Sequence, residues 1–191
     1  RALGKEERAS ELAGQLKGYH DLIKERISGT NSEERPTVFF EWLGKPYHSA
    51  SNGTSYDNFI DFAGGVNIAA NESVDYPDVS PEWVIEKDPD VILHILGSSK
   101  DYTEEELEQW RDEIISRPEL QNSRAVKEGR VYVLSGTVAT GVRSAIGELY
   151  LAKWFYPELF EDIDPGVEHE KLIKEFYNMK LEGGYAYPSN A

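Results

Sequence analysis

The chain has 191 residues, 39% of them hydrophobic and 12% aromatic, which is enough for one substantial buried core with an appended helix. Its 35 acidic and 20 basic residues give a net charge of −15, which repels phosphate backbones, so we expect no nucleic-acid partner. The chain has no cysteine, which excludes disulfides, thiol catalysis and thiolate metal sites. It starts at Arg1 without a methionine, so we expect a processed or trimmed piece.

The first part of the chain is predicted to form one long helix, Gly4–Ile27, because its apolar residues recur at spacings of three and four. This stripe comprises Leu12, Leu16, Tyr19, Ile23 and Ile27. A polar linker, Ser28–Arg35, separates the helix from the rest of the chain.

The next segment predicts a strand followed by a helix. Thr37–Trp42 reads TVFFEW, and its β-branched and aromatic residues favour a strand. The loop Leu43–Thr54 is rich in glycine, serine and aromatic residues. Ser55 is expected to cap a helix that ends at the Gly64-Gly65 pair. Val66–Ala70 is too short to assign, so a further strand there stays open.

The central stretch, Ser80–Leu96, reads SPEWVIEKDPDVILHIL and predicts a helix followed by a strand. Ser80 suits the N-cap, and Pro81 suits the first helical position. Asp88 is expected to end the helix because the residue before a proline is disfavoured in helical conformation. The apolar run Val91–Leu96 is typical of a strand that is covered on both faces, as in a parallel sheet.

The second half continues the alternation of helices and strands. After the loop Gly97–Tyr102, a Thr103-x-x-Glu106 capping box begins a helix that Pro118 ends. The remaining predicted elements are a turn (Ala125–Arg130), a second buried strand (Val131–Leu134), a small-residue loop (Ser135–Gly141), two helices (Val142–Phe155 and Val167–Tyr177) and a tail from Gly183.

This order predicts an α/β fold, a three-layer Rossmann-like unit with a mostly parallel sheet of about four strands and a long N-terminal helix. In such sheets ligands bind outside the carboxyl ends of the strands. We therefore expect a ligand at the loops Leu43–Thr54, Gly97–Tyr102 and Ser135–Gly141. The segment Tyr76–Ser80 joins this edge if Val66–Ala70 is a strand.

Catalytic signatures are scarce, and we expect no enzyme and no cofactor. The sequence lacks GxSxG, a phosphate-binding GxxxxGK[ST] loop, HExxH and a dinucleotide GxGxxG. The four histidines form no i, i+4 pair; His94 is interpreted as a hydrogen-bonded core histidine and His48 as a solvated loop residue rather than a metal ligand.

The expected edge instead carries aromatic residues and one arginine. Aromatic side chains combine apolar area with a polar tip, which suits a large, partly polar ligand, although several, Trp42 among them, are equally candidates for the core. Those in or beside the loops are Trp42, Tyr47, Tyr56, Tyr76, Trp83 and Tyr102. Arg143 begins a helix after a small-residue loop, where it suits a carboxylate or phosphate, or equally a surface position or an acidic partner.

Three segments together resemble a known family. SPEWVIEKDPDVIL, RPELQNSRAVKEGRVYVL and GVRSAIGELYLAKWFYPELF resemble the C-terminal lobe of periplasmic-binding-protein-like receptors, which serve ABC importers of iron–siderophores, haem and cobalamin. The resemblance implies that residues 1–35 are the interlobe backbone helix and linker, and that residues 36–191 are the C-terminal α/β lobe. The N-terminal lobe of such a receptor would then be missing from this sequence.

The resemblance also implies a function and a set of contacts. It implies a membrane-tethered receptor outside the cytoplasm that captures a metal chelate and delivers it to an ABC permease. The implied ligand contacts are Tyr47, Tyr56 and Arg143, with Trp42, Tyr76 and Ser98 behind them. Receptors of this family dock onto their permease through surface glutamates, for which Glu148 is the candidate here.

Two alternatives remain open at this stage. One is an enzyme on a Rossmann-like sheet that acts on a metal chelate or nucleotide, which would require a nucleotide loop or catalytic cluster. The other is an interaction domain whose acidic surface binds a basic partner.

Overall fold

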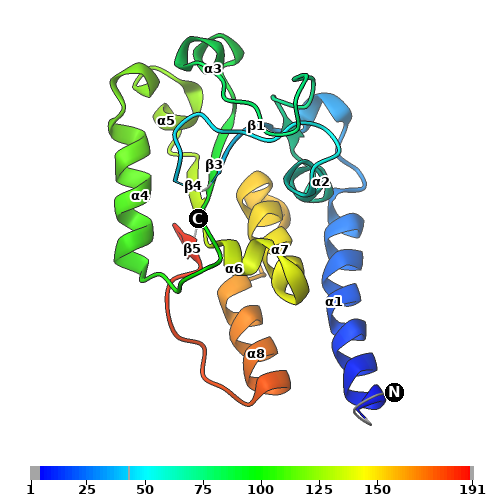
Figure 1. Ribbon diagram of the computed structural model, residues 1–191. Helices are drawn as coiled ribbons and strands as arrows, with labels where there is room; N and C mark the ends of the chain where they lie inside the picture. Colours follow the sequence, from blue (N-terminus) through cyan, green and yellow to red (C-terminus); the bar gives the residue numbers. More distant parts are fainter. Residues whose placement is uncertain (1–4, 43, 190–191) are drawn as a thin grey trace.

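The computed structural model describes residues 5–42 and 44–189, and a five-stranded sheet lies at its centre (Figure 1). The strands are β1 (Thr37–Trp42), β2 (Val66–Asn67), β3 (Val91–Ile95), β4 (Val131–Leu134) and β5 (Ala186–Tyr187). Their order is β2-β1-β3-β4-β5; the first four run parallel, and β5 is antiparallel to β4. The prediction of an α/β fold with a mostly parallel sheet is confirmed.

Helices cover both faces of this sheet. The α-helices are α1 (Glu6–Ile27), α2 (Ser55–Phe62), α3 (Pro81–Lys87), α4 (Glu104–Ser116), α5 (Arg124–Lys127), α6 (Gly136–Ala139), α7 (Ser144–Phe155) and α8 (Pro165–Tyr177). Single 3₁₀ turns are η1 (Ser32–Glu34), η2 (Pro118–Leu120), η3 (Gly141–Arg143) and η4 (Pro157–Leu159). Within the described ranges, no helix combines the length and apolarity that crossing a membrane requires.

Alternation along the strands sends side chains into two separate clusters, one on each face of the sheet. Phe40 and Leu93 belong to the larger cluster, with residues of α1, α2, α7 and α8. Phe39 and Ile92 belong to the smaller cluster, with residues of α3, α4 and α5. Figure 1 shows α4 on one side of the strands and α1, α2 and α7 on the other, so the three-layer prediction holds.

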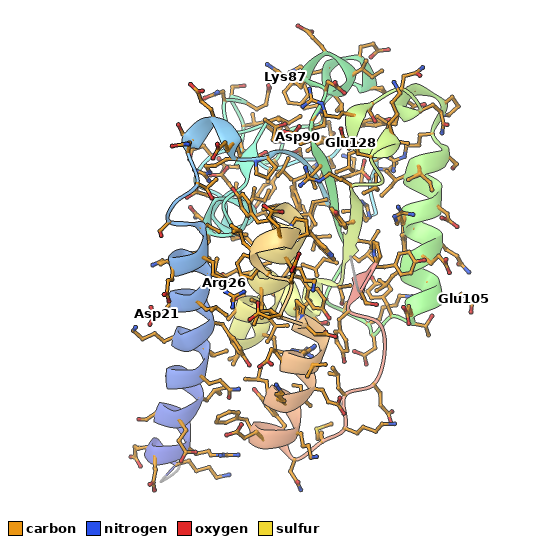
Figure 2. The ribbon with its side chains drawn as sticks, turned by 180° about the vertical axis from the view of Figure 1, so that it is seen from behind. Asp21, Arg26, Lys87, Asp90, Glu105 and Glu128 are labelled. Atoms are coloured by element: carbon orange, nitrogen blue, oxygen red, sulfur yellow. The ribbon has the colours of Figure 1, made fainter. Side chains whose placement is uncertain are left out.

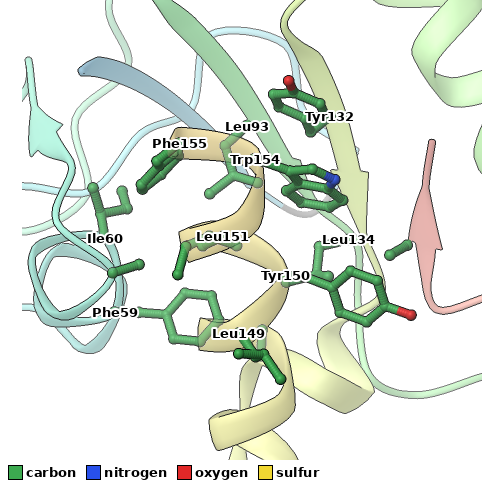
Figure 3. Packing of buried hydrophobic residues seen from close by; sticks show 14 of the residues in the cluster. Phe59, Ile60, Leu93, Tyr132, Leu134, Leu149, Tyr150, Leu151, Trp154 and Phe155 are labelled. Atoms are coloured by element: carbon green, nitrogen blue, oxygen red, sulfur yellow. The ribbon is translucent and has the colours of Figure 1, made fainter. Parts of the chain in front are cut away.

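Helix α7 supplies the centre of the larger cluster (Figure 3). Trp154 is 1% exposed and stacks on Tyr132 of β4, with 4.6 Å between ring centroids and an interplanar angle of 7°. Leu149 and Leu151 are fully buried in the same cluster. Nine of the twelve residues of α7 are buried, which explains why its sequence is apolar around most of the helix.

Helix α1 lies along this cluster; Asp21 is exposed on its outer side, whereas Arg26 is partly buried and bonds the Leu159 carbonyl and Asp162 (Figure 2). Tyr19 and Ile23 are its buried residues, and Tyr19 donates a hydrogen bond to Glu168 of α8. The predicted apolar stripe therefore faces α7 and α8.

The local helix signals act mostly as the sequence predicts. The Ser80 hydroxyl accepts a hydrogen bond from the Trp83 N–H, and Thr103 and Glu106 form the expected capping box. Asp88 ends α3 in a left-handed conformation with φ 41°. Helix α2 differs, because its N-cap is Thr54 and not Ser55: the Thr54 hydroxyl accepts from the Asp57 N–H.

Several segments differ from the sequence prediction. The segment Val66–Ala70, which the sequence left unassigned, contains β2, an edge strand of two residues beside β1. The turn Ala125–Arg130 starts within α5, and the loop Ser135–Gly141 contains α6 and the start of η3. The tail adds β5, a fifth strand. These short elements depend on neighbours in space, which local propensity does not report.

Candidate functional site

The loops that follow β1, β2, β3 and β4 all leave from the same edge of the sheet, because these four strands are parallel. The segment that enters β5 arrives at this edge as well, since β5 is antiparallel to β4. Two groups of side chains stand here, one on the loops of β1 and β2 and the other between the loops of β3, β4 and β5.

The first group is an aromatic cluster formed by Trp42, His48, Tyr56 and Tyr76. The Trp42 ring lies 5.8 Å from His48, 5.4 Å from Tyr56 and 5.1 Å from Tyr76 between ring centroids. Tyr56 is 8% exposed and stacks on Phe40 beneath, whereas Tyr76 is 41% exposed. The aromatic cluster is therefore rooted in the core and open at its outer end.

Hydrogen bonds tie together the two loops that carry the aromatic cluster. His48 Nδ1 lies 2.6 Å from Asp78 Oδ1, and Lys45 Nζ donates to the same carboxylate at 2.7 Å. These contacts lower the pKa of Asp78, first through the hydrogen bond from Lys45 and then through that from His48. The backbone adds bonds from the Val79 N–H to the Tyr47 carbonyl and from the Ser49 N–H to the Pro77 carbonyl. These hydrogen bonds hold the two loops together.

The second group surrounds a recess of about 500 Å³, which we call the Arg143 recess. Its walls include Asp101 after β3, Arg143 in η3 and Tyr185 before β5. The Arg143 guanidinium lies 5.8 Å from the centroid of the Tyr185 ring and makes no salt bridge with any described residue. An arginine without a carboxylate partner is free to bind an anionic group.

Behind Tyr185 lies His169 of α8, which is fully buried. The two rings meet edge to face at 4.6 Å between centroids. Neither nitrogen of His169 has a hydrogen-bond partner among the described residues. Burial, with a smaller contribution from the charge of Arg143, lowers the pKa of His169 to about 4, so its ring is neutral near pH 7.

The structure brings together three of the six predicted ligand contacts, Trp42, Tyr56 and Tyr76. Arg143 belongs to the Arg143 recess, and Ser98 is exposed in the loop after β3.

Tyr47 lies apart from the aromatic cluster, on the face of the sheet covered by α3 and α4. Its hydroxyl donates to Glu119 Oε1 at 2.6 Å, and its ring stacks on Phe39.

The predicted permease-docking residue, Glu148, is not at the surface as expected for that role. Its side chain is 12% exposed, on α7, and its Oε2 lies 2.8 Å from Nε2 of His20 of α1. Burial raises the pKa of Glu148 to about 7. The packing of α1 on α7 accounts for this burial, which helix periodicity alone did not reveal.

The sequence interpretation did not select Tyr185, Asp101 or His169 as site residues. Asp101 lies in the expected loop Gly97–Tyr102, whereas Tyr185 lies in the tail and His169 on a distant helix. The interpretation set His48 aside as solvated, whereas 18% of that side chain is exposed and its ring stacks on Trp42. His94 is the buried core histidine expected, but only its Nδ1 is bonded, to Glu41; Nε2 has no partner among the described residues. In the portion of the chain that the structure covers, no three His, Asp or Glu side chains are grouped to hold a metal ion.

Comparison with known proteins identifies the family. A family model described as periplasmic binding protein matches residues 1–137. The chain belongs to the periplasmic binding protein family. A solved structure of the TroA-like periplasmic binding protein FepB from Veillonella parvula is 28% identical, with a TM-score of 0.84 over 97% of this chain and 57% of that one.

Curated relatives agree with this membership of the periplasmic binding protein family. The molybdate-binding protein MolA of Haemophilus influenzae is 24% identical over 98% of this chain and 50% of its own length. The vitamin B12-binding protein of Vibrio campbellii is 26% identical over 58% of this chain and 38% of its own length. The chain thus spans 50% of the length of MolA and matches 38% of the length of the vitamin B12-binding protein. The ligands named for these two relatives differ from each other.

Proposed function

We propose that the chain is one lobe of the substrate-binding component of an ABC importer. In this proposal residues 1–35 form the interlobe helix and linker, and residues 36–191 form the C-terminal lobe. The full-length receptor works outside the cytoplasm, tethered to the membrane. It captures an iron–siderophore, haem or cobalamin-type metal chelate and delivers it to a permease. The family membership and the names of the relatives support the importer role.

The observation that carries the proposal is the pairing of two unlike surfaces on one edge of the sheet. The aromatic cluster offers flat, partly exposed rings, and the Arg143 recess offers a guanidinium that has no carboxylate partner among the described residues. Flat rings suit the face of a macrocycle or of aromatic chelating groups, and a guanidinium suits a carboxylate or another anionic group. A large anionic metal chelate combines these features in one ligand.

Within this site each predicted residue has a distinct task. Trp42 and Tyr76 contact the flat part of the ligand, with Tyr56 supporting Trp42 from the core side. Arg143 binds the anionic part, and the exposed Ser98 contributes a hydrogen bond from the loop between the two groups. Tyr47 contributes indirectly, because its backbone N–H bonds to Glu41 and holds the loop that carries His48.

Tryptophan fluorescence of the full-length protein tests the proposal, with a ferric siderophore, haemin, cobalamin and molybdate as probes. We expect saturable quenching by one of the metal chelates. A Trp42→Phe variant should lose most of this quenching, whereas Trp83→Phe on α3, away from the site, should keep it. If molybdate is the single probe that binds, the ligand is a small oxyanion and the proposed metal chelate is wrong. If none of the probes binds, the proposal is refuted.

A further inference from the structure

A charged group is buried inside the sheet, directly beneath the loop that follows β1. Glu41 is fully buried, and it is the residue before Trp42 on β1. Its carboxylate accepts two hydrogen bonds from Arg117, to Oε1 at 2.7 Å and to Oε2 at 3.0 Å. His94, its neighbour on β3, approaches Oε2 at 2.9 Å through Nδ1. Arg117 follows the last residue of α4, and it also binds Glu113 on that helix.

Stability alone does not explain this arrangement. Buried ion pairs are often no more stabilising than apolar residues of similar volume, because both charges lose their hydration. The neighbouring position on the same face, Phe39, is apolar and fully buried. Burial by itself would raise the pKa of Glu41, but the hydrogen bonds from His94 and Arg117 outweigh it and lower this pKa to about 2. The carboxylate is thus charged throughout the physiological range, at a position where a hydrophobic residue would fit the pattern.

The same carboxylate holds the loop. Glu41 Oε1 accepts the Tyr47 backbone N–H at 2.7 Å, and Tyr47 has a φ of 60°, an unfavourable conformation for a residue with a side chain. The Tyr47 ring lies 5.3 Å from the Arg117 guanidinium, and its hydroxyl donates to Glu119. Tyr47 is therefore anchored by its backbone, its ring and its hydroxyl to one group of charged residues.

The residue after this anchor belongs to the binding surface. The His48 carbonyl accepts the Trp42 N–H at 2.9 Å, and the His48 ring stacks on the Trp42 ring with an interplanar angle of 17°. Tyr47 and His48 thus lie on opposite faces of the sheet, so the loop crosses the end of β1 between them. At its start the loop passes close to α4: a Cβ on Gly44 would lie 2.8 Å from the Trp110 ring.

We propose that Glu41 and Arg117 are positioning residues for ligand capture, which fix the loop 44–48 through Tyr47 so that His48 and Tyr76 stand against Trp42. The ties from Asp78 then carry the fixed position on to the loop after β2. The role in ligand capture rests on the proposed function, whereas the positioning of the loop rests on the contacts of Glu41 and Arg117 with Tyr47. It gives Tyr47 the role of an anchor rather than a direct ligand contact.

Amide hydrogen exchange and ligand binding test the inference in the full-length protein. The informative variant is the double substitution Glu41→Leu with Arg117→Met, which removes both charges, removes the oxygen that accepts the Tyr47 N–H and avoids a lone buried carboxylate. We expect backbone exchange at residues 44–49 to speed up without ligand, while β3 and β4 stay protected. If the competent loop is then populated about one tenth of the time, the affinity for the probe that binds the wild type falls roughly tenfold.

An Arg35→Met variant is the matched control. Arg35 is also a partly buried arginine, bonded to the Gly64 and Gly65 carbonyls and to Asp61, outside the binding edge. A purely structural effect would lower stability in both variants and leave loop exchange and affinity unchanged. We also expect Arg117→Lys, with Glu41 intact, to retain part of the loop protection because it keeps one charged donor.

The two proposals fail separately. If the double variant folds and residues 44–49 exchange as in the wild type, the positioning role is overturned, whatever the ligand. Unchanged affinity for a bound probe overturns it as well, while the receptor function stands. If the wild type binds no probe, the receptor function falls, and loop exchange alone decides whether the pair positions the loop.

Discussion

The two faces of the sheet use the same strands in different ways. The face covered by α1, α2, α7 and α8 is filled with aliphatic and aromatic side chains, with Trp154 stacked on Tyr132 at its centre. The face covered by α3, α4 and α5 buries Glu41 and His94 on adjacent strands, next to Arg117. The comparison teaches that one face supplies cohesion, while the other combines a smaller core with charged groups that orient a loop.

The largest expected effect comes from breaking the apolar face. Trp154→Ala should reduce the free energy of unfolding by about 3–5 kcal/mol, because it empties a large volume in a tightly packed cluster. Denaturant unfolding monitored by circular dichroism measures the loss. Trp83→Ala on α3 is the control, since that ring is only half-buried and its removal should cost clearly less. Equal losses for the two variants would contradict the assignment of cohesion to the α7 face.

The charged face should respond differently to one and to two substitutions. Arg117→Met alone leaves the buried Glu41 carboxylate without its main partner and should cost about 3 kcal/mol of unfolding free energy. Adding Glu41→Leu should recover most of this loss, because no uncompensated charge remains. Denaturant titrations measure the unfolding free energies of both variants. If the double variant is as unstable as Arg117→Met alone, the ion pair itself stabilises the fold.

Lowering the pH should destabilise the face of the sheet covered by α1, α2, α7 and α8, because His169 is buried there. The folded pKa of His169, about 4, lies below its ordinary value of 6.5, so the unfolded chain takes up this proton first as pH falls. The stability that neutral, buried His169 contributes is fully present above pH 6.5. As the pH falls towards 4, the free energy of unfolding decreases by up to about 3 kcal/mol.

The difference in unfolding free energy between the wild type and His169→Gln, followed from pH 7 to pH 4.5, isolates this term. Carboxylates common to both proteins cancel in the comparison. A difference that does not change with pH would show that His169 titrates alike in both states.

The smallest effect is expected at the edge where the two faces end. Arg143→Ala in the full-length protein should reduce the affinity for an anionic ligand by about 1.5–3 kcal/mol, as for hydrogen bonds to charged groups. Isothermal titration with haemin, whose carboxylates supply the anionic groups, measures the change. Lys127→Ala is the control, because Lys127 is an exposed cation at the end of α5 and does not line the recess. Unchanged affinity for Arg143→Ala would remove this arginine from the site.

Local sequence determined much of the fold. The strands Thr37–Trp42 and Val131–Leu134 have the predicted limits, and the caps at Ser80 and Thr103 form as expected. These features depend on side chains a few residues apart and on apolar runs, both of which can be read directly. The parallel sheet then follows from the alternation of helices and strands, and it fixes which loops share an edge.

The tertiary structure alone decided how residues within those loops are sorted. Tyr47 and His48 are adjacent, yet one anchors to Glu119 on one face and the other stacks on Trp42 on the opposite face. The sequence did hold one signal, an acidic residue in the apolar strand TVFFEW, which burial in a covered strand obliges to find a partner.

That partner, Arg117, lies 76 residues away, as Tyr185 lies far from Arg143. Spacing along the chain predicts neighbours on one helix or strand, because the geometry of those elements is regular. It does not predict which distant side chains meet, because that depends on how whole elements pack. The two parts of the candidate site therefore became visible only in the folded chain.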